Sequence, residues 1–164
     1  MILAYASIME WNNMCHMTKP SYIAMLNLLR ANALMEERLA GELASVHGID
    51  INEAMLLMHL ARAPLNRLSR IDLAKRLHLS ASTVTRMTAP MEKTGLVTRQ
   101  PDPRDARLAY VVLTKAGLKL VADVRTTLES RSADFFRDRW TSEEISILAG
   151  FLARLTANEP GEPI

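Results

Sequence analysis

The sequence predicts a mainly α-helical fold with a small β wing, built as one domain. Aromatic residues make up only 5% of a chain that is 49% hydrophobic, a composition typical of an aliphatic helical core. Helix-capping residues recur along the 164 residues, and two short segments rich in β-branched residues stand close together at 96–100 and 109–114. Helices on both sides of one short pair of strands indicate a helical domain that carries a β hairpin.

A long helix is predicted from about Tyr22 to Val46, and Gly48 is placed to end it. Apolar residues form two stripes along this helix: Met25, Leu29, Leu39, Leu43 and Val46 in one, and Leu26, Ala33, Ala40 and Ala44 in the other. A helix that is apolar on two faces usually packs on two sides. A partner subunit would supply one of these surfaces.

Three shorter helices are predicted next, each from the residues at its start. Asp50 and Glu53 form a capping pair for a helix that ends at about Ala61. The next two starts each carry a capping residue and a hydrophobic staple: Ser69 and Asp72 with Leu68 and Leu73, then Ser80 with Leu79 and Val84.

Two strands follow, LVTRQ at 96–100 and AYVVLT at 109–114, because these segments are rich in β-branched residues. Between them, PDPRDARL contains two prolines and four charges, which predicts a protruding hairpin loop. Thr114 is expected to cap a long helix to about Arg139, and Thr141 with Glu144 to form a capping box for a last helix.

In this order of elements, the helices that begin at Ser69 and Ser80 and the strands behind them form a winged helix-turn-helix. Such a motif places its second helix in the DNA major groove, with N-terminal residues reaching the base edges. Val84, Met87 and Met91 recur at helical spacing and predict the buried side of that helix.

The polar residues at the start of this second helix are therefore candidates for DNA contact. They are Ser80, Ser82, Thr83, Thr85 and Arg86. Short hydroxyls bond phosphates, and Arg86 has the reach and the bidentate fork for a guanine edge. The alternative is that these residues only cap the helix and face solvent, and Ser80 is a cap in either interpretation.

Charge is distributed unevenly along the chain. Residues 62–110 hold ten Lys and Arg against four Asp and Glu, a balance of +6, and the remainder holds ten against fourteen, a balance of −4, which sums to the formal +2. A basic centre within a mildly acidic frame is typical of a polyanion site. A charge-mixed, solvated surface is the alternative.

Three motifs in this basic centre carry a resemblance: LSASTVTR, EKTGLV and DPRDARLAYVVLTKAG. Together they resemble the core of the MarR family of bacterial transcription regulators, over about residues 49–121. The resemblance implies a repressor that acts as a homodimer on a pseudo-palindromic operator in double-stranded DNA. It also implies release by a small, commonly aromatic, ligand in a pocket between the helices predicted at 22–46, 50–61 and 114–139. No ligand-binding residue is assigned.

The family's wing motif, Asp-x-Arg, falls on Asp105 and Arg107. A carboxylate orients a guanidinium, and an arginine held in this way can enter the narrow, electronegative minor groove. Arg104, nearer the loop tip, is a second candidate. A surface ion pair without a function is the alternative.

The chain departs from the family pattern at two positions. His78 stands at the turn where many relatives have glycine, a position expected to need a positive φ. Pro90 removes the amide that would bond the carbonyl of Arg86, and it is predicted to bend or interrupt the helix there.

The expected organisation is an N-terminal extension (1–20), a dimerisation helix (21–48), the winged helix-turn-helix (49–113), C-terminal dimerisation helices (114–157) and a disordered tail (158–164). The extension is either disordered or docked on a partner. Its apolar start, MILAYASIM, lacks the basic region of a signal peptide and is too short to span a membrane. With one cysteine, Cys15, no disulfide can form within the chain, so a reducing cytoplasm is expected.

Catalysis finds little support in the sequence. Cys15 and His16 are the only thiol and imidazole neighbours, and adjacent helix residues point in different directions. The four histidines lack the clustered spacing of a metal site, so no cofactor, metal or enzymatic activity is predicted. Two alternatives remain: a winged helix that binds proteins rather than DNA, and a redox-sensing regulator that uses Cys15.

Overall fold

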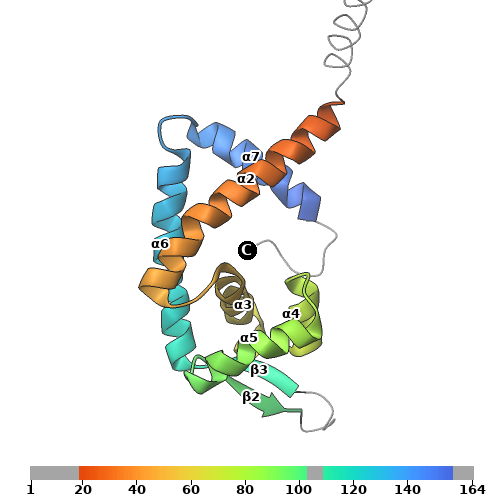
Figure 1. The fold of residues 1–164 in the computed structure, drawn as a ribbon, viewed down its shortest axis with the longest axis vertical. Helices are drawn as coiled ribbons and strands as arrows, with labels where there is room; N and C mark the ends of the chain where they lie inside the picture. The colour runs from red at the N-terminus through yellow and green to blue at the C-terminus, as the bar shows by residue number, and fades with distance from the viewer. Residues whose placement is uncertain (1–18, 103–108, 157–164) are drawn as a thin grey trace, which may run out of the picture. The chain divides into compact units, whose positions relative to one another are not determined.

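The computed structural model describes residues 19–102 and 109–156, and helices dominate it (Figure 1). The chain divides into two compact units, Met1–Gly41 and Glu42–Ile164. The expectations for the N-terminal extension up to residue 18, for Cys15, for the loop residues Arg104, Asp105 and Arg107, and for the tail lie outside the described residues.

The elements follow in the order that the sequence predicts, with additions at 43–47 and 64–69. They are α2 (Pro20–Glu42), the π-helical turn η1 (Leu43–His47), α3 (Ile51–Arg62), the 3₁₀ turn η2 (Pro64–Asn66), β1 (Arg67–Ser69), α4 (Arg70–Arg76), α5 (Ala81–Lys93), β2 (Val97–Pro101), β3 (Ala109–Leu113), α6 (Lys115–Phe136) and α7 (Ser142–Thr156).

The first long helix consists of α2 and η1, and it ends where the sequence predicts. Gly48 adopts the left-handed conformation at φ 68°, and its amide donates to the carbonyl of Ala44. No residue of α2 is buried, and Met25 and Leu29 are 51% and 60% exposed. The predicted apolar stripes are therefore largely uncovered along α2 in the single chain.

The predicted helix starts are confirmed by their capping hydrogen bonds. Asp50 accepts from the amide of Glu53 at 2.8 Å, and the carboxylate of Glu53 accepts from the amide of Asp50 at 2.9 Å. The remaining caps each accept from the amide three residues on: Ser69 from Asp72, Ser80 from Thr83, Thr114 from Gly117 and Thr141 from Glu144. Without these acceptors, the first amides of each helix would lack a partner inside the chain.

The core of the second unit is aliphatic, as the composition predicts. Its most deeply buried large side chains come from η1 and four helices and are Leu43, Leu56, Leu57, Leu60, Leu73, Val84 and Val124. Helix α3 lies at the centre, against α4, α6 and β3 (Figure 1). Because α4 and α5 pack on this core, their outer faces are held in a fixed relation to the sheet.

The wing is a three-stranded antiparallel sheet in the order β1-β3-β2, rather than the predicted pair of strands. Leu68 of β1 and Arg99 of β2 both pair with Val111 of β3. The two predicted strands are confirmed within one residue at their ends. Strand β1 was not predicted because three residues are too short to show an alternating pattern.

Candidate nucleic-acid interface

The turn between α4 and α5 has the backbone conformation that the sequence predicts. His78 adopts φ 52°, in the left-handed region that non-glycine residues rarely occupy. Its amide donates to the carbonyl of Lys75 at 3.3 Å, and the amide of Leu79 donates to the carbonyl of Ala74 at 2.9 Å. These bonds close α4 and direct the chain into α5, so the turn sets the relation between the two helices.

A network of three hydroxyls occupies the first turn of α5. Ser80 Oγ accepts from the amide of Thr83 at 3.1 Å and lies 2.8 Å from both Ser82 Oγ and Thr83 Oγ1. The structure thus brings together three of the five predicted contact residues of this helix. Ser80 caps the helix, and the exposed Ser82 keeps hydrogen-bonding capacity toward solvent.

The two remaining candidates of this helix, Thr85 and Arg86, differ in their surroundings. Thr85 Oγ1 donates to the carbonyl of Ala81 at 2.9 Å and accepts from Nη1 of Arg70 at 3.3 Å. Arg86 is exposed and has no hydrogen-bonding or ion-pair partner within residues 19–102 and 109–156. A cation presented in this way retains all its donors for an external acceptor.

The opposite side of α5 is anchored in the core. Val84 and Met91 are buried as predicted, but Met87 is only half-buried, and Thr88 is the third buried residue. The predicted buried stripe is therefore wrong at one position. Counting from Val84, the buried face of the helix passes through the fourth residue, Thr88, rather than through the third, Met87. Thr88 is accommodated there because its hydroxyl donates to the carbonyl of Thr85 at 3.3 Å.

Pro90 does not interrupt α5, which continues to Lys93, so the predicted interruption is wrong, whereas the bend stays a prediction. The proline lies in the last turn, where it removes a single amide bond, to the carbonyl of the exposed Arg86. Downstream, its own carbonyl accepts from both the amide and the hydroxyl of Thr94, at 3.0 and 3.2 Å. These bonds hold the end of the helix together after the proline.

Polar side chains connect the three strands at the base of the wing, a feature that sequence reasoning missed. Nη1 of Arg67 donates to Oε1 of Gln100 at 3.3 Å, and its guanidinium carbon lies 4.6 Å from the centroid of the Tyr110 ring. A hydrogen bond to the Asp102 carboxylate raises the pKa of Tyr110, with a smaller Coulombic contribution from the same group. In the sequence, only the occurrence of aromatic and charged residues at positions that face each other on neighbouring strands could have indicated these contacts.

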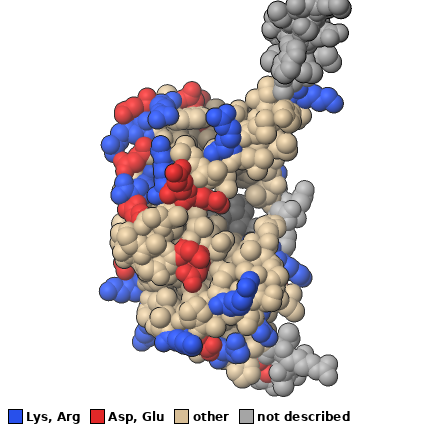
Figure 2. Space-filling model, in the orientation of Figure 1, with Lys and Arg blue, Asp and Glu red and all other residues tan. Residues whose placement is uncertain are grey.

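The helix-turn-helix and the sheet form a basic region. Residues 67–102 contain seven Lys and Arg and three Asp and Glu, a balance of +4. Lys and Arg side chains gather along the lower edge of the view in Figure 2, over α5 and the sheet, whereas both signs alternate over α6. A region of this kind attracts polyanions over distances of about 10 Å at moderate salt.

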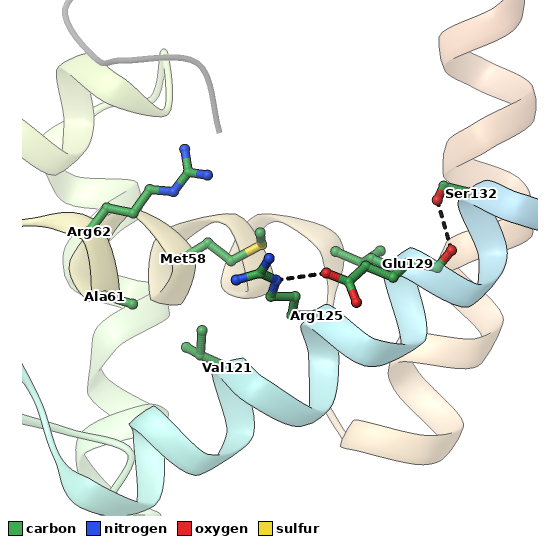
Figure 3. Close-up of a pocket in the computed structure, with 8 residues that line it drawn as sticks. Met58, Ala61, Arg62, Val121, Arg125, Glu129 and Ser132 are labelled. Atoms are coloured by element: carbon green, nitrogen blue, oxygen red, sulfur yellow. Dashed lines mark hydrogen bonds and ion pairs between the residues drawn. The ribbon is translucent and has the colours of Figure 1, made fainter. Parts of the chain in front are cut away.

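A separate, open pocket of about 490 Å³ lies between α3 and α6. Its lining combines apolar side chains with two arginines: Met58, Ala61, Arg62, Val121, Arg125, Leu128, Glu129 and Ser132 (Figure 3). Nε of Arg125 pairs with Glu129 at 2.8 Å. His59 is buried instead, where desolvation and, to a smaller extent, Arg76 and Arg62 lower its pKa.

Residues 19–102 and 109–156 contain no group of three His, Cys, Asp or Glu residues able to hold a metal ion. None of the described helices is both long and apolar enough to cross a membrane.

Comparison with known proteins finds similar sequences and similar folds. A sequence model of the MarR family matches residues 47–108. The chain is 31% identical over 83 residues to the uncharacterized HTH-type transcriptional regulator YcgE of Bacillus subtilis, a match that covers 51% of this chain and 53% of the relative. It is 30% identical over 97 residues to the HTH-type transcriptional regulator PrsX of Escherichia coli, covering 59% and 58%. The chain thus spans little more than half the length of these relatives.

Solved structures extend the likeness beyond the central motif. Sco3205, a MarR family transcriptional regulator from Streptomyces coelicolor solved in complex with DNA, is 26% identical with a TM-score of 0.74, covering 86% of this chain and 88% of that chain. AbsC, from the same organism, is 25% identical with a TM-score of 0.73, covering 86% and 95%. The fold is therefore that of a winged helix-turn-helix protein. The chain is thus similar to MarR family regulators, in sequence over residues 47–108 and in fold over most of its length.

Proposed function

We propose that this chain is a homodimeric, sequence-specific DNA-binding transcriptional regulator, a repressor whose operator binding responds to a small ligand. The observation that carries the proposal is Arg86. It is an exposed cation near the start of a helix whose other side is anchored by Val84 and Met91. Its fork matches the two acceptors of a guanine edge in the major groove.

The proposed DNA contacts come from α5 and from the wing. They are Ser80, Ser82, Thr83, Thr85 and Arg86 on the helix, and Arg104, Asp105 and Arg107 on the loop. The hydroxyls of Ser80, Ser82 and Thr83 would position the protein on phosphates, whereas Arg86 would read a base. Arg107, oriented by Asp105, would enter the minor groove, where its contribution depends on groove width. The relatives support this function because several are named as transcriptional regulators, and Sco3205 was solved with DNA.

Homodimerisation is supported by uncovered apolar side chains on the helices from both ends of the chain. Tyr22 and Leu29 of α2 are 50% and 60% exposed, and Phe151 and Leu155 of α7 are 58% and 67% exposed. A single soluble chain rarely exposes so many large apolar residues, and a two-fold symmetric partner would cover them. Sedimentation should therefore give twice the 18.3 kDa of one chain. A stable, folded monomer at micromolar concentration would exclude this dimer.

The pocket between α3 and α6 supports the ligand response. Arg62 and Arg125 would bind an anionic group, and Met58, Val121 and Leu128 would pack on an apolar body. This combination suits a small aromatic carboxylate. We expect benzoate to weaken DNA binding by the wild type, and Val121→Trp, which fills the pocket, to abolish that response. Unchanged DNA binding at saturating concentrations of several aromatic carboxylates would contradict this ligand class.

The test of DNA recognition starts from duplexes that the wild-type chain selects from a random library. Arg86→Ala should cost about 1–3 kcal/mol per half-site on the selected duplex and much less on a scrambled one at the same salt. Arg107→Ala should lose more affinity as the A·T content near the site ends rises, and Asp105→Ala should reproduce part of that loss. Equal losses on both duplexes for Arg86→Ala would show that it contacts only phosphate. If no sequence is enriched and binding does not depend on salt, the protein-binding alternative would be favoured.

A further inference from the structure

A hydrogen bond connects the two helices of the helix-turn-helix through their side chains. Nη1 of Arg70, the first residue of α4, donates to Oγ1 of Thr85 in α5 at 3.3 Å. Both residues are half-buried, and they lie 15 positions apart in the chain. Thr85 directly precedes Arg86, so this bond lies beside the residue proposed to read a base. Arg70 is not among the contacts predicted from the sequence.

The hydroxyl of Thr85 is already committed in this arrangement. Its single proton is donated to the carbonyl of Ala81 at 2.9 Å, and one of its lone pairs accepts from Arg70. Phosphate oxygens at neutral pH only accept hydrogen bonds. Thr85 therefore has no proton to offer a phosphate while both of its bonds are in place, and its geometry suits the orientation of Arg70 instead.

The positive charge of Arg70 is not neutralised within the described part of the chain. Its bond to Thr85 uses one of five guanidinium donors, and no carboxylate of residues 19–102 or 109–156 forms an ion pair with it. The carboxylate closest to it in sequence, on Asp72, accepts from the hydroxyl of Ser69 at 2.7 Å. A half-buried guanidinium held by a neutral acceptor keeps its full charge for an anion from outside the protein.

We propose that Arg70 binds a phosphate of the DNA backbone and that Thr85 orients its guanidinium for this contact. The inference rests on the proposed DNA binding by α5. In a helix-turn-helix, the second helix enters the major groove while the first crosses the backbone, so an anion beside α5 and near α4 is a backbone phosphate. The guanidinium fork bonds two oxygens of one phosphate. Such a contact fixes the register of α5 without reading sequence.

The experiment measures binding of the full-length chain to the selected duplex and to its scrambled counterpart over a range of salt concentrations. Arg70→Ala should weaken binding to both duplexes by the same factor, about tenfold or more for a dimer, and should reduce the slope of log K against log[salt] by about 2. Arg139→Ala is the matched control, because it removes an exposed arginine beyond the far end of α6 and should change neither quantity. Arg70→Lys should keep the slope and lose part of the affinity.

Thr85 is tested by a pair of variants that leave the charge unchanged. Thr85→Val removes the acceptor for Arg70 and should weaken binding to both duplexes, whereas Thr85→Ser restores the hydroxyl and should recover it. Thermal unfolding of each variant separates this effect from a loss of fold.

The outcomes decide between the two proposals. If Arg70→Ala and Arg70→Lys both keep wild-type affinity and salt slope while Arg86→Ala loses affinity for the selected duplex, the Arg70 contact is wrong and the proposed function stands. A loss for Arg70→Ala that is confined to the selected duplex would overturn the phosphate assignment in favour of base contact. If the wild type binds neither duplex in a salt-dependent way, the proposed function and the Arg70 contact are both wrong.

Discussion

Glu42 and Arg131 form a two-bond ion pair between the end of α2 and the last third of α6, across 89 positions of the chain. Nη2 of Arg131 donates to Oε1 of Glu42 at 2.8 Å, and its Nε donates to the other carboxylate oxygen. A few residues further along the chain, Nε2 of His47 lies 2.8 Å from the hydroxyl of Thr127, also on α6. The residues that follow the boundary at Gly41 are thus tied to α6 by two separate polar contacts.

The ion pair predicts a pH dependence of stability. The hydrogen bond from Arg131, and to a smaller extent the charges of Arg131 and His47, lower the pKa of Glu42 below its ordinary value of 4.5. Because the folded state holds the carboxylate ionised more strongly than the unfolded chain does, the pair contributes fully above about pH 4.5. That contribution is lost as the pH falls through the lowered pKa.

We expect Glu42→Gln to unfold at lower urea concentration than the wild type at pH 7, with a small difference because the pair is exposed to solvent. The difference should shrink as the pH falls below 4.5. Urea unfolding at a series of pH values measures it, and Glu36→Gln, on the exposed face of α2, is the control. A difference that grows toward acid pH would contradict the assignment.

Ser80 allows the stability of α5 to be separated from its binding to DNA. Ser80→Ala removes the acceptor for the amide of Thr83 and should lower the free energy of unfolding by about 1 kcal/mol. Ser80→Asp keeps a capping acceptor and should preserve stability, but it places a negative charge where a phosphate is proposed to bind. Chemical denaturation and DNA titration of both variants test this. Undiminished DNA binding by Ser80→Asp would place the phosphate elsewhere.

The positive φ of His78 predicts how substitutions at this turn change the stability of the protein. Glycine adopts φ 52° without a clash between Cβ and the backbone, so His78→Gly should raise the free energy of unfolding by about 0.5–1 kcal/mol. A β-branched residue is strained there, so His78→Val should lower it by more than about 1 kcal/mol. Denaturant midpoints of the two variants provide the measurement. A loss of stability in His78→Gly would mean that the imidazole makes a stabilising contact that outweighs the strain.

Gly117 lies where even a methyl group would be too large, so we expect its replacement by alanine to destabilise the fold. A Cβ at this position would lie 2.2 Å from the carbonyl oxygen of Leu96 and 2.6 Å from Cδ1 of Leu113. Gly117→Ala should therefore lower the free energy of unfolding by about 1–3 kcal/mol, despite the better helix propensity of alanine. Gly41→Ala, also within a helix but with no atom within 4 Å, should be neutral or stabilising. Equal effects of the two changes in thermal unfolding would show that α6 moves away from Leu96 at little cost.

Local chemistry explains which parts of the fold were predictable from sequence. The predicted helix starts after the first long helix each rest on one side chain that accepts from a nearby amide, so Asp50, Ser69, Ser80 and Thr114 could be placed without tertiary information. Strand β1 and the burial of Thr88 depend on what packs against them, and no pattern within a few residues records that. The interruption at Pro90 was wrongly predicted for a related reason, because the cost of a proline depends on how much helix follows it.

The candidate interface was predictable in its residue types but not in its connections. Arg86 could be placed on an exposed face from helical spacing alone, and the structure puts it there. The bond from Arg70 to Thr85 joins two helices whose relative placement follows from the turn at His78 and from packing on α3. The polar contacts of Arg67 with Gln100 and Tyr110 depend on β1, so they could not be predicted once that strand was missed.

The junction between β3 and α6 has a mechanical consequence for the wing. The carbonyl of Leu96 accepts from both the amide and the hydroxyl of Thr114, at 3.1 and 3.0 Å, and the absence of a side chain at Gly117 lets α6 begin directly against it. The hydroxyl of Thr114 also lies 2.7 Å from the carbonyl oxygen of Gly95, so the residue before α6 is bonded to both residues that precede β2. We therefore expect a rotation of α6 about its axis to carry the start of β2 with it.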